Sequence, residues 1–121
     1  VRSDVQSYKK YIEMKLKDLI SFLGGTFAKK SEYPAWEYRS ESKLREIAVA
    51  VYEEQYKKSP VIEAIHAGLE CGILAGKMPD LDIVSIGPDI FDIHTPKERL
   101  SISSTKRVYQ FVLGVLERIC D

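Results

Sequence analysis

The amino-acid sequence predicts an α/β (α+β) fold in which helices alternate with short strands. Apolar residues recur at helical spacing in three long stretches, and short apolar runs typical of strands lie between them. The chain has 121 residues, of which 45% are hydrophobic and 30% charged, so it is long enough to bury a core. The expected order of elements is β-α-β followed by α-β-α-β-α.

The first helix is expected over residues 4–23. Ser3 followed by Gln6 reads as a capping box, and Gly24 begins a pair of glycines that can end the helix. Residues 26–38 contain Pro34 within an alternating aromatic pattern, which indicates an edge strand. The helix itself is indicated by apolar residues that recur at helical spacing: Val5, Tyr8, Ile12, Leu16, Leu19, Ile20 and Leu23.

The rest of the chain predicts three helices and two strands. Ser40 or Ser42 can cap a helix that runs to about Tyr56, and Ser103 or Ser104 can cap the last helix. Between these helices we expect a strand at 61–65, a turn that leads into a short helix, and a buried strand at 81–87. The inward faces of the two long helices are predicted to be Leu44, Ile47, Ala48, Val51, Tyr52 and Tyr56, and then Val108, Phe111, Val112, Val115, Leu116 and Ile119.

The overall composition argues against several classes of partner. Eighteen basic residues balance eighteen acidic ones, so the charge gives no reason to expect binding to nucleic acid or to an anionic membrane. No apolar stretch approaches the roughly 18 residues of a membrane-spanning helix. Two well-separated cysteines predict no disulfide framework and favour a reduced intracellular setting.

Two histidines are the candidate metal ligands. His66 and His94 lie 28 positions apart, and no cysteine or histidine stands at zinc-finger spacing from either. A lone histidine is more often a hydrogen-bonded structural group. Both, however, follow strand-like runs, and ligands of α/β sheets gather at the carboxyl ends of strands. An acid beside an imidazole can fix its tautomer, and Glu98 is such a neighbour of His94.

Three further residues have a functional and a structural interpretation. The turn from His66 to Glu70 is glycine-bearing and can approach a ligand, but it can equally be an ordinary turn with Glu70 near a helix N-terminus. A catalytic pair of Cys71 with His66 is set aside, because nothing orients the ring. Arg2 can grip a carboxylate with two hydrogen bonds, although most arginines near a chain end are solvated.

The motifs HAGLECG and GPDIFDIHTPKERL, together with the opening VRSDVQS, resemble the aminoacyl-histidine dipeptidases, also called Xaa-His or cytosol non-specific dipeptidases. These are co-catalytic dizinc peptidases, and the resemblance covers essentially the whole chain. It implies that residues 1–39 are the second half of a lid and dimerisation domain, and that 40–121 are the C-terminal part of the catalytic zinc-peptidase domain. It also implies a cytoplasmic enzyme that is a homodimer through its lid domain.

The resemblance implies specific roles. His94 matches a zinc ligand, Thr95 and Glu98 match the surround that fixes its loop, and Arg2 matches the lid arginine that approaches the substrate carboxylate. His66 and Glu70 are expected to line the substrate pocket. In the complete enzyme a metal-activated water would attack the peptide carbonyl of a dipeptide, and a glutamate would act as general base.

The other metal ligands and the general base of that family have no match in this sequence. His94 alone cannot hold zinc, because a catalytic site needs about three protein ligands. The sequence therefore predicts the C-terminal part of a dipeptidase with two zinc ions, inactive and weakly metal-binding when alone. The alternative is a non-catalytic module that folds or associates in its own right.

Overall fold

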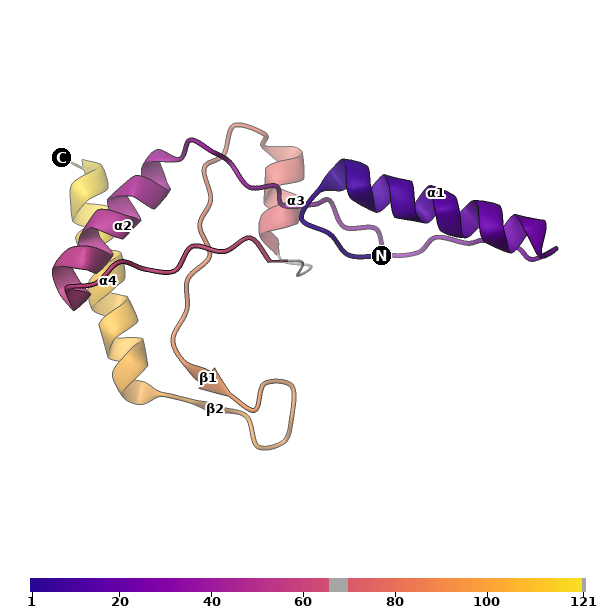
Figure 1. Cartoon of the computed structure of the whole chain (residues 1–121). Coiled ribbons are helices and arrows are strands. Elements are labelled where there is room, and N and C mark those ends of the chain that lie inside the picture. The colour runs from indigo at the N-terminus through magenta and orange to yellow at the C-terminus, as the bar shows by residue number, and fades with distance from the viewer. Residues whose placement is uncertain (66–69, 121) are drawn as a thin grey trace. The chain divides into compact units, whose positions relative to one another are not determined.

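The structure, a computed structural model, describes residues 1–65 and 70–120. The elements in the described ranges are α1 (Gln6–Phe22), α2 (Lys43–Tyr56), α3 (Glu70–Lys77), β1 (Ile90–Phe91), β2 (Arg99–Leu100) and α4 (Ile102–Cys120), as Figure 1 shows. All the helices that the apolar periodicity predicted are confirmed, with bounds that differ by a few residues. The fold is therefore mixed in its content, although its strands are few and short.

The chain forms two compact units. One comprises Val1–Ser40 with Ile62–Leu81, and the other comprises Glu41–Val61 with Asp82–Asp121. The chain first passes from one unit to the other between Ser40 and Glu41, and it returns to the first unit at Ile62. The assignment of 1–39 to a lid and 40–121 to a catalytic domain stays a prediction.

The predicted strands at the N-terminus, at 26–38, at 61–65 and at 81–87 are wrong for this structure. These segments run as irregular chain, and the described residues contain one sheet, the pair β1–β2 (Figure 1). A strand needs a neighbour to pair its backbone N–H and C=O groups. Side-chain patterns identify segments suited to a sheet, but they carry no information on whether that neighbour is present.

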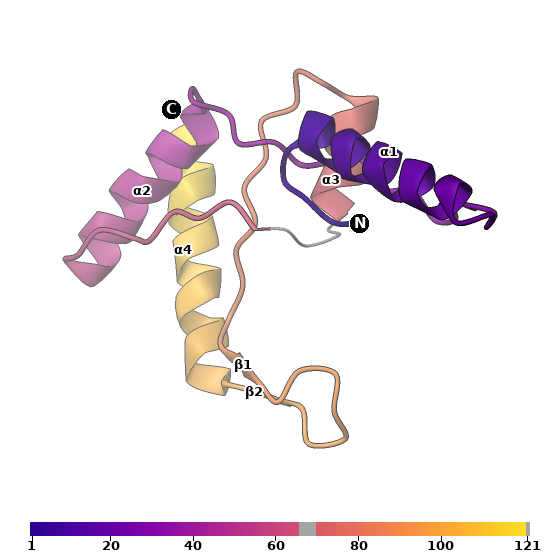
Figure 2. The same ribbon diagram turned by 45° about the vertical axis from the view of Figure 1, so that its right-hand side comes forward.

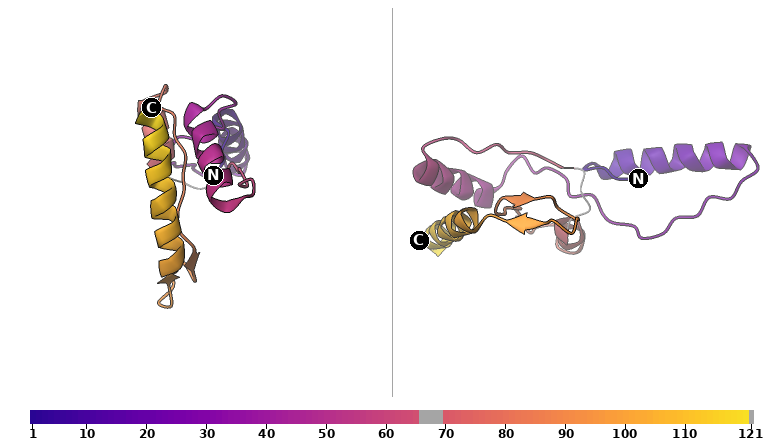
Figure 3. Two further views of the ribbon diagram at one scale, coloured as in Figure 1. Left: turned by 90° about the vertical axis from the view of Figure 1, so that its left-hand side faces the viewer. Right: turned by 90° about the horizontal axis from the view of Figure 1, so that it is seen from below.

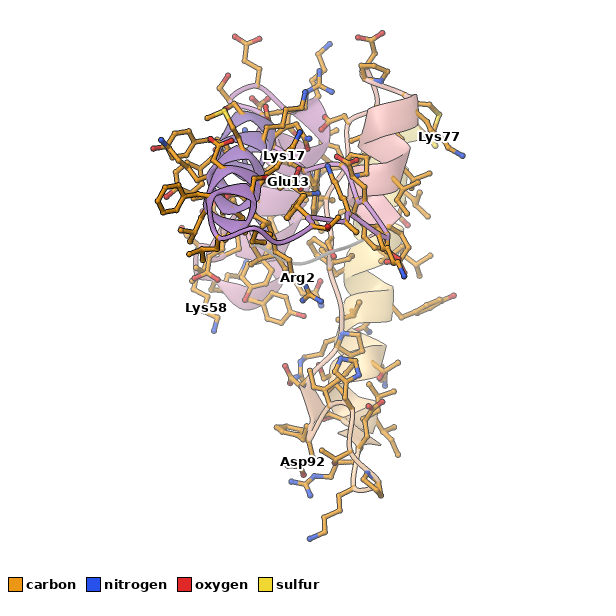
Figure 4. All side chains as sticks on the ribbon, turned by 90° about the vertical axis from the view of Figure 1, so that its right-hand side faces the viewer. Arg2, Glu13, Lys17, Lys58, Lys77 and Asp92 are labelled. Carbon is orange, nitrogen blue, oxygen red and sulfur yellow. The ribbon has the colours of Figure 1, made fainter. Side chains whose placement is uncertain are left out.

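Polar contacts tie α1 to the segment that follows it. Lys9, which is buried, donates its Nζ to the Tyr33 carbonyl, and the Ala35 N–H donates to Gln6 Oε1 at 2.8 Å. Glu13, labelled in Figure 4, pairs with Lys29 at 2.7 Å. The Glu13 carboxylate raises the pKa of Lys29, and Lys29 in turn lowers the pKa of Glu32.

The N-terminus of α1 is capped by a residue distant in sequence. The predicted capping box is wrong, because Ser3 Oγ accepts from the Val5 N–H instead of from the helix. The Gln6 N–H donates to Glu37 Oε1 at 2.8 Å, so a carboxylate 31 residues away satisfies a group that the helix leaves unpaired. The predicted stop is confirmed: α1 ends at Phe22, and Gly24 takes the left-handed φ of 77°.

Two glycines let α3 contact the Pro34 segment closely. A Cβ at Gly72 would lie 2.7 Å from the Pro34 carbonyl oxygen, and one at Gly76 would lie 3.0 Å from the Pro34 ring. A side chain at Gly72 would therefore displace backbone. Gly72 and Gly76 thus have a packing role in the structure.

The core of the second unit is the contact of α2 with α4, which lie side by side in Figures 1 and 2. Val51, Phe111 and Val115 are buried there, each contributing about 1.5–3 kcal/mol of transfer free energy. Gly114 permits the approach, since a Cβ there would lie 3.0 Å from Val51 Cγ1. The predicted inward stripe of α2 is confirmed, as Leu44, Ile47, Ala48 and Tyr52 pack against this cluster.

Two of the six residues in the predicted inward stripe of α4 remain exposed. Phe111 and Val115 are buried, whereas Leu116 and Ile119 remain 52% and 51% exposed. The predicted cap of α4 is also displaced: Ser101 Oγ accepts from the Ser104 N–H at 3.3 Å, so the cap is Ser101. Sequence alone offers three candidate serines within four positions, and only the tertiary contacts select between them.

The N-terminus of α2 is held by Ser42, as predicted, and by Asp82. Ser42 Oγ accepts from the Arg45 N–H at 3.0 Å and donates to Asp82 Oδ1 at 2.6 Å. Asp82 Oδ2 accepts from the Leu44 N–H at 2.9 Å. The carboxylate therefore adds negative charge at the positive end of the helix and joins two segments that are 38–40 residues apart in sequence.

We predict that Asp82→Ala lowers the free energy of unfolding by about 1–3 kcal/mol, because the Leu44 N–H and the buried Ser42 hydroxyl lose a charged partner. Urea unfolding followed by helical circular dichroism measures the change. The matched control is Asp80→Ala, which removes an exposed carboxylate two positions away. Equal losses in the two variants would contradict the capping role.

Candidate functional site

The residues of the predicted metal loop form a β-hairpin. β1 and β2 are antiparallel, with Ile90 opposite Leu100 and Phe91 opposite Arg99, and both arrows are seen in the right-hand view of Figure 3. The loop Asp92–Glu98, called the His94 loop below, joins them. The irregular loop expected around His94 is confirmed, although the short strands on either side of it were not predicted.

Asp89 anchors the base of the hairpin to α4. Its carbonyl accepts from the Ser101 N–H at 3.0 Å, and its N–H donates to the buried Ser104 Oγ at 2.9 Å. Its carboxylate lies 3.5 Å from the Arg107 guanidinium. The hairpin is therefore attached to the first turns of the helix that carries the core residues Phe111 and Val115.

His94 lies in the His94 loop with its side chain exposed. Its imidazole makes no hydrogen bond or ion pair with any residue in the described ranges, so both ring nitrogens are free to meet a group from elsewhere. Its backbone N–H donates to Glu98 Oε2 at 2.8 Å. The predicted neighbour Glu98 thus contacts the backbone of His94 and not its ring.

Two residues of the loop have left-handed backbones without being glycine. Asp92 has a φ of 53° and His94 a φ of 63°. Such a conformation costs about 1–3 kcal/mol for each residue and persists where surrounding interactions impose it. Aspartate and histidine adopt it more readily than most side chains.

Thr95 and Arg99 hold the other end of the loop. The Asp92 carbonyl accepts from the Thr95 N–H at 3.2 Å and from Thr95 Oγ1 at 2.7 Å, while the Lys97 N–H donates to Thr95 Oγ1 at 3.2 Å. Arg99 lies 3.3 Å from the Asp92 carboxylate and 5.4 Å from the centre of the Phe91 ring. Arg99 could not be identified from the sequence, because its partners are set by strand register and no linear motif encodes them.

Two of the other predicted site residues, Arg2 and Glu70, belong to the first unit, whereas His94 and Glu98 belong to the second. Arg2 belongs to the first unit, lies in the segment that leads into α1 (labelled in Figure 4), and is exposed. Glu70 is exposed in the first turn of α3, as its structural interpretation predicted. His66 lies outside the described residues. The roles of Arg2, His66, Glu70 and Glu98 in binding a substrate or metal stay predictions.

The described residues do not by themselves fit a zinc site. Across 1–65 and 70–120, no three side chains of histidine, cysteine, aspartate or glutamate gather closely enough to hold a metal ion. His94 supplies one exposed imidazole where a catalytic zinc site takes about three protein ligands. Within the same ranges, no helix is both long and apolar enough to cross a membrane.

Comparisons with known proteins identify relatives that are much longer. The chain is 34% identical over 119 residues to the cytosol non-specific dipeptidase of Escherichia coli K12, covering 98% of this chain and 24% of that protein. It superposes with a TM-score of 0.82 and 31% identity on the crystal structure of aminoacylhistidine dipeptidase from Vibrio alginolyticus, covering 96% of this chain and 24% of that one. No protein-family model matches the chain.

Proposed function

The chain is homologous to about a quarter of a cytosol non-specific dipeptidase, and from this premise we propose that it acts as the C-terminal part of a zinc-dependent dipeptidase. In this proposal the complete protein hydrolyses dipeptides of the Xaa-His type in the cytoplasm. The single observation that carries the proposal is the match in both sequence and structure along 98% and 96% of the chain. A match of this extent to two named dipeptidases favours a shared activity over a shared fold alone.

The surface of the chain supports its place in a larger fold. Among the described residues, three large apolar side chains are buried, whereas many others remain exposed, among them Phe22 at 86% and Val61 at 84%. The apolar segments 61–65 and 81–87 carry backbone groups suited to a sheet but have no ladder partner in the described residues. We propose that strands from the rest of a longer protein pair with these segments and cover their side chains.

His94 is proposed as one zinc ligand of the complete enzyme. The support is its exposed imidazole, which is free of hydrogen bonds to the described chain, on a loop whose backbone is held by several hydrogen bonds. Glu98 supports the loop. The remaining ligands of the two zinc ions, as the family resemblance implies, come from outside this chain; zinc, when bound, would supply Lewis-acid activation of water.

Arg2 is proposed to bind the free carboxylate of the substrate. Its guanidinium is exposed and makes no hydrogen bond or ion pair with the described residues, so it remains available for a bidentate contact. His66 and Glu70 are proposed to line the substrate pocket. For Glu70 the support is its exposure in the first turn of α3.

A homodimer through the lid domain is part of the proposal, and the outer surface of α1 favours it. Tyr8, Leu19, Phe22 and Leu23 of this region are exposed. The same observation favours the second candidate function, a non-catalytic association module. Sedimentation and mass measurements on the native protein distinguish the enzyme from the association module. A dimer of a polypeptide several times longer than 121 residues supports the enzyme.

We predict that the 121-residue chain alone hydrolyses no dipeptide and binds zinc weakly, because the described residues offer one imidazole and no ligand cluster. Calorimetric titration with zinc at neutral pH measures the affinity. A stoichiometric submicromolar site that His94→Ala abolishes would show that the chain is a metal protein in its own right.

In the complete enzyme, His94→Ala should lose one of two zinc ions and lower kcat by more than about a hundredfold, since even partners of the ligands typically contribute 10–100-fold. The fold should persist, because the His94 side chain is exposed and makes no contact that the loop requires. Elemental analysis counts the metal, and Lys97→Ala in the same loop is the control. Unchanged zinc content in His94→Ala would exclude His94 as a ligand.

Arg2→Lys in the complete enzyme should lower kcat/KM for free dipeptides by roughly ten- to a hundredfold, because lysine keeps the charge and loses the two-pronged geometry. Dipeptide amides lack the carboxylate, so the same substitution should change their slower hydrolysis little. Steady-state kinetics with both substrates forms a double-mutant cycle between enzyme and substrate. If the substitution lowers kcat/KM equally for the free dipeptide and for the dipeptide amide, Arg2 has a structural role and does not bind the carboxylate.

A further inference from the structure

The His94 loop raises the question of what holds a histidine in a left-handed conformation. His94 has a φ of 63°, a region in which glycine is the usual occupant. The loop contains no glycine between Asp92 and Glu98. Its shape must therefore come from interactions of the neighbouring residues, and the hydrogen bonds of the loop identify them.

Glu98 is placed to hold the backbone of His94 in this left-handed conformation. Its carboxylate Oε2 accepts the His94 N–H at 2.8 Å, a charge-assisted bond and therefore among the stronger ones available to an exposed loop. Glu98 is itself fixed, because its own N–H donates to the Thr95 carbonyl at 3.1 Å. The loop is thereby closed on itself across four positions.

The Asp92 end of the loop is fixed by Thr95 and Arg99. The Asp92 carbonyl receives two hydrogen bonds from Thr95, and the Asp92 carboxylate faces Arg99 at 3.3 Å. Arg99 belongs to β2 and is paired with Phe91 in the ladder. Thr95 thus links the Asp92 end of the loop to Glu98, and His94 lies between Asp92 and Thr95.

We propose that Glu98 is a positioning residue that sets the backbone of His94, while leaving both nitrogens of the imidazole available for a metal or substrate. It acts through the main-chain N–H and neither fixes the tautomer nor touches the ring. Thr95 and Arg99 complete the support from the Asp92 side. The consequence for metal binding rests on the proposed function, but the conformational role of Glu98 does not.

The test uses the full 121-residue chain labelled with ¹⁵N-histidine, which contains two histidines and so gives two backbone amide signals. A His66→Gln variant identifies the signal of His94. In the parent, His94 should show a strong intraresidue contact between its amide and Hα protons, because a positive φ brings them together. In Glu98→Ala this contact should weaken, and the His94 amide should exchange with solvent at least about tenfold faster.

The conservative variant Glu98→Gln separates positioning from general stability. Glutamine retains an oxygen that accepts the His94 N–H without the charge, so the amide–Hα contact should survive and exchange should rise only about threefold. Lys97→Ala is the matched control, since the Lys97 side chain makes none of the loop contacts while its N–H bonds Thr95. It should leave the His94 signal unchanged.

A third variant makes the test independent of overall folding. His94→Gly removes the cost of the left-handed backbone, so adding Glu98→Ala to it should lower stability by less than Glu98→Ala does alone. A helical circular dichroism spectrum equal to that of the parent establishes that each variant is folded. An unaltered amide–Hα contact in Glu98→Ala, or equal loss of it in Lys97→Ala, would overturn the proposal.

Measurements on the complete enzyme distinguish this inference from the proposed function. If both hold, zinc affinity should fall by about tenfold or more in Glu98→Ala and should be largely restored in Glu98→Gln. A complete protein with no dipeptidase activity, together with the predicted amide behaviour, would remove the proposed function and leave the positioning role. If the His94 amide of Glu98→Ala behaves as in the parent, and the parent enzyme is fully active, the positioning role of Glu98 is wrong and the proposed function stands.

Discussion

The contact of Val51 on α2 with Phe111 and Val115 on α4 supports the rest of the second unit. Because α4 is held there, its first turns give Asp89 a fixed pair of partners in Ser101 and Ser104. That anchor holds the base of the hairpin, and the hairpin in turn carries the His94 loop. A side chain added at Gly114, which would press on Val51, would therefore also affect the His94 loop, although Gly114 is not part of it.

Helices were predictable from this sequence, and strands were not. The stripe of α2 could be identified because its packing partner is a second helix of the same chain, with Val51 meeting Phe111. The segments 61–65 and 81–87 have equally apolar sequences but no paired neighbour in the described chain. Helical hydrogen bonds are local, so their pattern is complete within one segment, whereas a strand depends on residues that the pattern does not include.

The candidate site was predictable in part. The position of His94 in an irregular segment between apolar runs could be inferred from the sequence, and Glu98 was expected to support it. The way in which Glu98 supports His94 could not be inferred, because Asp92 and His94 have left-handed backbones and both residue types commonly adopt other conformations. Arg99 was missed for a related reason: it meets Asp92 because the ladder sets Phe91 opposite it.

The short span of the hairpin has a consequence for how the chain folds. Ile90 and Leu100 pair across 10 positions, so the His94 loop can form on the timescale of an isolated hairpin, about 1–10 μs. The contact of Val51 with Phe111 spans 60 positions and requires closure of a much longer loop. The loop that carries His94 is accordingly closed by local contacts, whereas its anchor on α4 depends on a contact between distant parts of the chain.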